Sequence, residues 1–156
     1  MQSNKRSLIY ELIGKRLTKL YYDIEHDSLV MCFDGNYELT VKTYWRITSH
    51  ITIISTSLDM FINNNHERDD IECSQSLIIN TISVAANLLL GHNVYKAHIS
   101  RVKDLILKFD NDISILVFNN CNLRDFEYFV LTHDCASIKS VFDQHDGKIK
   151  IICHKA

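Results

Sequence analysis

The sequence has no proline, only four glycines among its 156 residues, and no long apolar run. None of its apolar stretches approaches the ~20 residues that a membrane-spanning helix needs. The N-terminal segment MQSNKRSLIYELIG begins with basic residues, but its apolar part is too short and too charged for a signal peptide. The sequence therefore predicts a cytoplasmic protein without membrane contact.

The five cysteines show no paired spacing such as CxxC: they are Cys32, Cys73, Cys121, Cys135 and Cys153. Disulfide frameworks and zinc sites normally show such pairs, so we expect reduced, buried thiols and no metal. The 17 basic and 19 acidic side chains give a net charge of −2. A general nucleic-acid binder usually carries a basic face, so this balance argues against nucleic acid as the partner.

Catalytic motifs are also missing: the sequence has no GxSxG, P-loop or GxGxxG motif, and none of its eight histidines lies in HExxH or HxH. Asp34 and Asp110 follow equivalent strand phenylalanines and could act as paired carboxylates. A turn role explains both, because Asp bonds its own backbone two residues on. We therefore expect no enzymatic activity and no cofactor, and leave open a ribonuclease that uses two histidines.

Two segments of the chain share nearly the same pattern. LIGKRLTKLYYDIEHDSLVMCFDGNYELTV (12–41) aligns with LLGHNVYKAHISRVKDLILKFDNDISILV (89–117), with Gly14 on Gly91. Apolar residues alternate in both segments, as they do in strands that bury one face. The alternating residues are Leu29, Met31, Phe33, Tyr37, Leu39 and Val41 in the first copy, and Leu105, Leu107, Phe109, Ile113, Ile115 and Val117 in the second.

This repeat predicts the fold class. Each copy would form an antiparallel meander with Asp-Gly or Asn-Asp in its hairpin turn. One such sheet leaves an apolar face in water, whereas two copies can cover each other. We therefore predict an α+β fold, mainly antiparallel β, with two repeated helix-plus-β-meander halves packed as two sheets with pseudo-twofold symmetry.

The length predicts a single domain over 1–156, with repeats at about 3–58 and 74–156 joined by a polar connection over 63–73. A helix is expected before each copy, in SNKRSLIYELIG and in CSQSLIINTISVAANLLLG, and each would end at a glycine. Further strands are expected over KTYWRI, HITIISTSL, FEYFVLTH, IKSVF and KIKIIC. The segment 134–144 stays open between a strand and a short helix.

Acidic side chains cluster in two segments, DIEHD and HERDDIE. They could be solvated loops, or they could oppose a basic cleft on a partner protein. Under the second interpretation the partner-binding residues are Tyr21, Tyr22, Asp23, Glu25, Asp27, Glu67, Asp69, Asp70 and Glu72.

Aromatic side chains interleaved with basic ones on a sheet can also stack on single-stranded nucleic acid. The aromatic candidates are Tyr21, Tyr22, Tyr37, Tyr44 and Trp45, together with Phe126, Tyr128 and Phe129. The basic residues near the first five in sequence are Lys15, Arg16, Lys19, Lys42 and Arg46. Burial in the core would explain Trp45 and most of the phenylalanines equally well. A single-stranded nucleic-acid-binding β platform is therefore the alternative function.

The second copy, followed by DFEYFVLTH and IKSVFDQHDGKIKIIC, resembles a family of small bacterial domains. In that family a Leu-x-Gly start leads to an x-Leu-x-Leu-x-Phe-Asp strand and turn, and then to an aromatic-Glu-x-aromatic strand. Such domains look like immunity proteins that accompany secreted or contact-delivered toxins. LYYDIEHDSLVMCFDGNYELTVKTYWRI is similar to the family's first half, including Trp45, whereas Phe129 stands where a second tryptophan is expected. The resemblance implies a one-to-one complex with a cognate toxin domain, commonly a nuclease, whose active site is covered.

Overall fold

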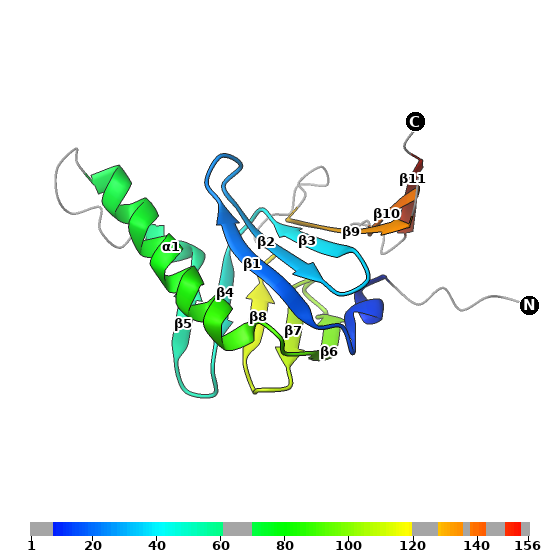
Figure 1. The fold of residues 1–156 in the computed structure, drawn as a ribbon, viewed down its shortest axis with the longest axis horizontal. Coiled ribbons are helices and arrows are strands. Elements are labelled where there is room, and N and C mark those ends of the chain that lie inside the picture. The colour runs from blue at the N-terminus through cyan, green and yellow to red at the C-terminus, as the bar shows by residue number, and fades with distance from the viewer. Residues whose placement is uncertain (1–7, 61–69, 120–127, 136–137, 143–148, 154–156) are drawn as a thin grey trace, which may run out of the picture.

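In the computed structural model, two antiparallel sheets form the body of the protein (Figure 1). The structure describes residues 8–60, 70–119, 128–135, 138–142 and 149–153. The six-stranded sheet has the order β1-β2-β3-β9-β10-β11, formed by β1 (Leu17–Asp23), β2 (Ser28–Phe33), β3 (Tyr37–Val41), β9 (Phe129–Cys135), β10 (Ile138–Phe142) and β11 (Ile149–Cys153). The five-stranded sheet has the order β5-β4-β8-β7-β6, formed by β4 (Trp45–Thr48), β5 (Ile53–Thr56), β6 (Val94–Ile99), β7 (Leu105–Phe109) and β8 (Ser114–Val117). The prediction of an α+β fold that is mainly antiparallel β is confirmed.

Alternating apolar residues produce the strands, as the sequence predicts. In β3, Leu39 and Val41 are buried while Glu38 between Tyr37 and Leu39 is exposed. The same alternation on β7 buries Leu105, Leu107 and Phe109, whereas Ile106 and Lys108 between them are partly exposed. Gly35 and Asn36 make the β2–β3 turn with φ values of 80° and 61°, a conformation that glycine and asparagine adopt at little cost.

The two meanders exchange the strands that follow them. After β3 the chain crosses to the five-stranded sheet, where β4 pairs with β8, and after β8 it crosses back, where β9 pairs with β3. The register is reciprocal, because Trp45 lies opposite Val117 and Phe129 lies opposite Val41. The bonds at the crossings are reciprocal too: Lys42 N–H donates to Tyr128 O, and Phe118 N–H donates to Tyr44 O, both at 2.9 Å. Neither sheet is therefore built from one meander alone.

The starts of the two meanders are bonded directly to each other. Four main-chain bonds connect them: Gly14 N–H to Val94 O (2.7 Å), Gly91 N–H to Leu17 O (3.0 Å), Val94 N–H to Lys15 O (2.9 Å) and Leu17 N–H to His92 O (3.0 Å). Arg16 and Asn93 form an isolated antiparallel bridge in the same place. Gly14 and Gly91 both have a left-handed backbone, with φ of +84° and +83°. This junction fixes the first strand of one sheet against the first strand of the other.

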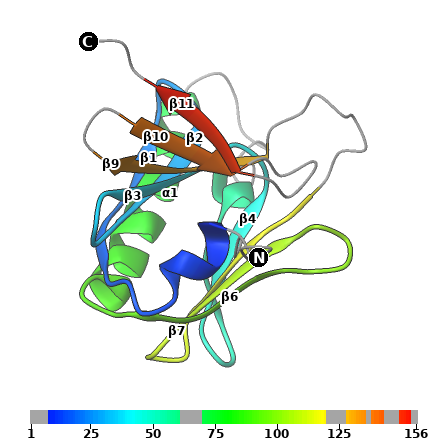
Figure 2. The ribbon, with the colours of Figure 1, turned by 90° about the vertical axis from the view of Figure 1, so that its right-hand side faces the viewer.

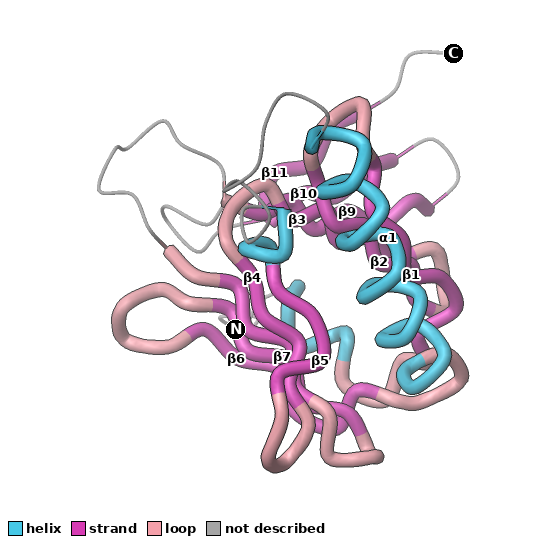
Figure 3. Tube along the Cα trace, turned by 90° about the vertical axis from the view of Figure 1, so that its left-hand side faces the viewer, coloured by secondary structure: helices cyan, strands magenta, loops and turns pink. Residues whose placement is uncertain are grey.

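The one α-helix among the described residues, α1 (Asp70–Leu89), closes one open end between the sheets by packing on β1 and β5 (Figure 3). Its buried face consists of Ile78, Ile82, Ala85, Ala86 and Leu89. The short 3-10 helix η1 (Leu8–Leu12) packs on β6 and β10 at the other end (Figure 2). A second 3-10 helix, η2 (Ser57–Met60), contacts α1.

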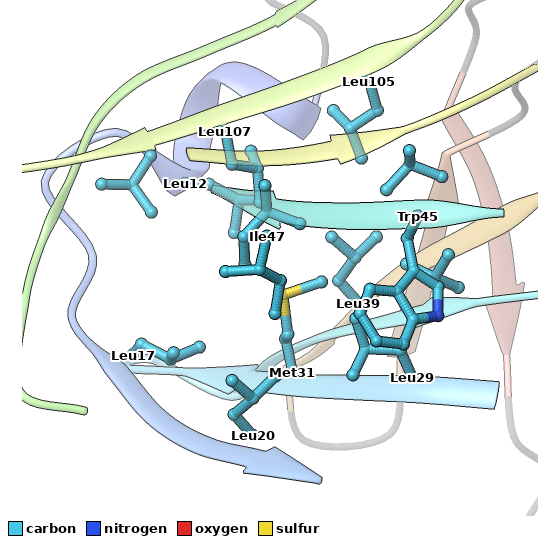
Figure 4. Packing of buried hydrophobic residues seen from close by; sticks show 14 of the residues in the cluster. Leu12, Leu17, Leu20, Leu29, Met31, Leu39, Trp45, Ile47, Leu105 and Leu107 are labelled. Atoms are coloured by element: carbon cyan, nitrogen blue, oxygen red, sulfur yellow. The ribbon is translucent and has the colours of Figure 1, made fainter. Parts of the chain in front are cut away.

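The hydrophobic core lies between the two sheets (Figure 4). Phe33 and Phe109 both point into it, with 3% and 0% of their surface exposed. Trp45 is 2% exposed and packs beside Leu29 and Leu39. Full burial of a large apolar side chain stabilises a fold by about 1.5–3 kcal/mol, so this layer supplies much of the stability.

Some expected elements differ in the structure. The helix expected to end at Gly14 is described only over Leu8–Leu12, as a 3-10 helix with an i→i+3 bond from Ile13 N–H to Tyr10 O (3.2 Å). The α1 helix begins at Asp70, inside the connection expected over 63–73, and acidic residues in a first helical turn are favoured by the helix dipole. Residues 63–69 of the expected connection, and residues 143–148 between the expected strands IKSVF and KIKIIC, lie outside the described residues.

The segment left open between strand and helix, 134–144, contains β10, which pairs with β9 and β11. The helical alternative is therefore wrong. A strand suits this position because it continues the six-stranded sheet.

Candidate partner-binding surfaces

The acidic hairpin tip lies between β1 and β2, and two of its carboxylates hold the turn. Asp23 Oδ1 accepts from the backbone N–H groups of Glu25 (3.1 Å) and His26 (3.3 Å), and Asp23 Oδ2 lies 2.8 Å from His26 Nδ1. The hydrogen bond from the His26 ring is the main reason why the pKa of Asp23 is lowered. Asp27 has a φ of 48° and accepts a hydrogen bond from the Tyr22 hydroxyl. These bonds shape the tip and leave fewer carboxylate lone pairs for a partner.

Other residues of the same region point into solvent. Glu25 and Glu38 are exposed, and the side chains of Tyr21 and Ile24 are 45% and 42% exposed. Burial is the main cause that raises the pKa of Tyr21, with smaller contributions from Cys32, Glu38 and Asp23, so Tyr21 lies within the field of these groups. We call Tyr21, Asp23, Glu25, Asp27 and Glu38 the acidic strip. The segment 20–41, which contains it, has no lysine or arginine.

The other predicted partner-binding residues fall in different settings. Tyr22 is partly buried and packs against the hydrophobic core, so its ring helps to hold the β1–β2 hairpin on the rest of the molecule. Glu67 and Asp69 lie outside the described residues, and Asp70 and Glu72 lie in the first turn of α1. The β1–β2 tip and the first turn of α1 both lie at the upper side of the molecule in Figure 1 and Figure 3.

Asp34 and Asp110 do not form a carboxylate pair for acid–base chemistry. Asp34 lies 3.3 Å from Arg16 Nε, whereas Asp110 lies 2.7 Å from His92 Nδ1 and accepts from Asn93 N–H (3.2 Å). The hydrogen bond from His92 is the main cause that lowers the pKa of Asp110. Each aspartate therefore ties the end of a strand to the junction between the meanders, which is a wider role than the predicted turn.

Tyr37 is the centre of a small aromatic cluster. Its ring stacks on His133 with centroids 4.1 Å apart and planes at 4°, and Lys15 Nζ lies 5.4 Å from its centroid. Its hydroxyl donates to Glu11 Oε2 at 2.6 Å. Burial first, and then Glu11, raises the pKa of Tyr37 to about 12, so this hydroxyl stays a donor at neutral pH.

An open depression of about 420 Å³ lies beside this cluster, lined by Thr18, Cys32, Phe33, Asn36, Tyr37, Glu38 and Thr132. Its only thiol is that of Cys32, and burial raises the pKa of that thiol. A protonated thiol is a poor nucleophile. The depression can therefore accept or donate hydrogen bonds, but it offers no activated nucleophile.

The outer face of the five-stranded sheet carries a group of basic residues that the sequence did not predict as a group. Arg46 and Lys108 each lie between buried neighbours on their strands. On β6, exposed Lys96 and partly exposed His98 lie on either side of buried Ala97. We call these four residues the basic face. Arg46 was named as a sequence candidate, but the other three were not. Their signal was the position of polar residues at outward-facing sites of β6 and β7.

Among the described residues, no three His, Cys, Asp or Glu side chains approach closely enough to hold a metal ion. Within the same part of the chain, no helix has both the length and the apolar character needed to cross a membrane. The surfaces that remain as candidates are therefore the acidic strip, the depression beside Tyr37 and the basic face.

Comparison of the chain with models of known protein families finds no match, and no curated protein or solved structure matches it. The function must therefore be inferred from these surfaces and from the resemblance noted in the sequence.

Proposed function

We propose that this protein is a non-catalytic immunity protein that binds a cognate secreted or contact-delivered toxin domain, a nuclease, and blocks its active site by covering it. The observation that carries the proposal is the acidic strip, whose carboxylates lie beside exposed apolar side chains. Nucleases surround phosphate with basic groups, so such a strip is complementary to their active sites. The proposed complex is one-to-one, forms in the cytoplasm, and needs no metal or cofactor.

Within the strip, Glu25 and Glu38 are the residues that we expect to meet the partner's basic groups. Asp23 and Asp27 already accept hydrogen bonds that shape the hairpin turn, whereas Glu25 is exposed. Glu38 is also exposed, and among the bonds of the described residues its carboxylate accepts only a long one from the Cys32 thiol (4.0 Å). Tyr21 can supply the aromatic contact area that often dominates binding energy at protein interfaces. Removal of a charge that becomes desolvated in such an interface costs ~1 kcal/mol or more.

We also infer that the two halves are copies of one unit related by a pseudo-twofold axis. The reciprocal hydrogen bonds at the junction support this inference, because they join aligned positions of the two copies. The bonds at the strand crossings are reciprocal too, just beyond the aligned segments. Register shifts occur at aligned places too, between Leu17 and Lys19 and between Val94 and Lys96. A duplicated unit would offer two outer faces of the same construction, of which only one carries the acidic strip.

The proposal predicts that a toxic nuclease domain is encoded beside this gene, and that domain is the partner with which to test it. Co-expression should protect cells from that domain, and titration calorimetry with the purified proteins should give a one-to-one complex. The double variant Glu25→Gln with Glu38→Gln should bind at least about fivefold more weakly, mainly through slower association at low salt. The expected loss comes from the missing long-range attraction.

Asp112→Asn is the matched control. Asp112 is exposed, and asparagine tolerates its φ of 64°. It lies in the β7–β8 turn, at the opposite side of the molecule from the β1–β2 tip (Figure 1). Removal of the Asp112 charge should leave the affinity for the toxin domain unchanged. The proposal is wrong if the neighbouring domain forms no complex, or if the control weakens binding as much as the double variant.

A further inference from the structure

Two lysines lie directly opposite each other on the outer face of the five-stranded sheet. The register pairs Lys96 of β6 with Lys108 of β7, and the next pair along is His98 with Ile106. Burial is the main cause that lowers the pKa of His98, and Lys96 and Lys108 lower it further. Positive charge is therefore concentrated at this place on the sheet.

Like charges directly opposite each other on a sheet are destabilising. Within the described residues, no ion pair offsets this repulsion at either lysine. The aligned place in the other sheet differs, because there Lys19 lies opposite Cys32, and Glu38 follows on the next strand. The repulsion on the five-stranded sheet is a cost to the isolated protein that a bound anion would remove.

Apolar and aromatic groups accompany these charges. Leu116 and Ile106 lie in one cross-strand row between Arg46 and His98, and both are partly exposed. The Arg46 guanidinium lies 5.6 Å from the centroid of the Phe118 ring, and its Nε has no hydrogen-bond partner within the described residues.

Two tyrosines add exposed rings near this row. The side chain of Tyr95 is 52% exposed next to Lys96. The side chain of Tyr44 is 46% exposed, and its carbonyl accepts from Phe118 N–H at 2.9 Å.

We propose that this face binds single-stranded nucleic acid, with phosphates at Lys96, Lys108 and Arg46 and with bases on the adjacent aromatic and aliphatic side chains. Any base can stack on an aromatic side chain, whatever the nucleotide sequence, and basic side chains bind the phosphates of the backbone. An acidic peptide would satisfy the charges but would leave the exposed tyrosines without a role. The net charge of −2 does not reveal this basic face, because carboxylates elsewhere in the sequence offset its positive charges. The proposal does not rest on the toxin complex.

Fluorescence anisotropy with a labelled oligothymidylate of ~15 nucleotides tests the proposal in the full-length protein. Binding should weaken with salt, with a log–log slope of about −2 for three phosphate contacts. Lys96→Glu should weaken binding at least about fivefold, whereas the matched variant Lys19→Glu, at the aligned place on the other sheet, should leave it unchanged. Lys96→Glu replaces a repulsive pair with an attractive one, so its melting temperature should not fall.

A second pair of measurements separates nucleic acid from an acidic protein. Tyr95→Ala should weaken oligothymidylate binding at least about fivefold, because a stacked base is lost. Polyglutamate of similar length should compete poorly. The proposal is refuted by the absence of binding at low salt, by equal losses in Lys96→Glu and Lys19→Glu, or by equal competition from polyglutamate, which would assign the face to an acidic polypeptide.

Discussion

The exchanged strands predict that the two halves unfold as one unit, although the sequence repeats. Because β4 pairs with β8 and β9 pairs with β3, loss of either meander exposes an edge of both sheets. A substitution that destabilises one end of the core should therefore also destabilise the other end. Leu17→Ala in the six-stranded sheet is a suitable perturbation, because Leu17 is 0% exposed and lies at the opposite end of the core from Trp45 (Figure 4).

The expected magnitude follows from burial. Replacement of a fully buried leucine by alanine costs about 2–5 kcal/mol, because the lost contacts leave a cavity. For a chain of this size, 1 kcal/mol lowers the melting temperature by about 2–4 °C. Leu17→Ala should therefore lower the melting temperature by about 4–20 °C. Ile51→Ala, at a residue that is 91% exposed, should change stability by less than ~0.5 kcal/mol.

The assay is urea unfolding followed by two probes. Trp45, the only tryptophan, reports on the five-stranded sheet, and far-ultraviolet circular dichroism reports on all strands. Both probes should give the same midpoint in the parent protein, and both should shift together in Leu17→Ala. A fluorescence midpoint that stays in place while the circular dichroism transition splits in two would refute the reasoning, since the halves would then unfold separately.

Two further predictions concern the junction between the meanders. The hydrogen bond from His92 lowers the pKa of Asp110 below the ordinary value of an aspartate, so its stabilising contribution is present above that ordinary value and is lost as the pH falls through the folded-state pKa. Asp110→Asn should therefore show a smaller loss of stability between neutral and acid pH in chemical denaturation, and an unchanged acid dependence would contradict the assignment. Gly91 has a φ of +83° and open space around an added Cβ, so Gly91→Ala should lower the free energy of unfolding by about 1–2 kcal/mol through backbone strain alone, and Gly91→Asn by less. Chemical denaturation measures both variants, and an alanine variant of unchanged stability would show that the left-handed backbone is not required.

Alternation of apolar residues was sufficient to predict the strands. It placed Phe33 and Phe109 in the core, because period-2 burial is a local property of each strand. The exchange of β4 and β9 between sheets was not predictable in the same way, since it depends on which distant edge each strand meets. The residues at a strand crossing have no local sequence pattern that predicts which sheet the next strand joins.

The candidate sites were harder to predict than the strands. Net charge suggested a surface without a basic region, but Lys96 and Lys108 become neighbours only through the β6–β7 register. Tyr22 was expected to contact a partner, yet it packs against the core and bonds Asp27. Asp23 was predicted as a partner-binding residue, and in the structure its carboxylate already accepts hydrogen bonds from backbone N–H groups of the turn. Side-chain direction and hydrogen bonding at a turn decide which charges remain for binding.

The crossing of β4 and β9 also bears on how this protein can change over time. A substitution on the inward side of a strand alters packing shared by both layers, so it tests the stability of the entire molecule. A substitution on the outward side alters only what that layer presents to water. New recognition properties can therefore be acquired on one exterior without loss of those on the other, as long as the interior is conserved.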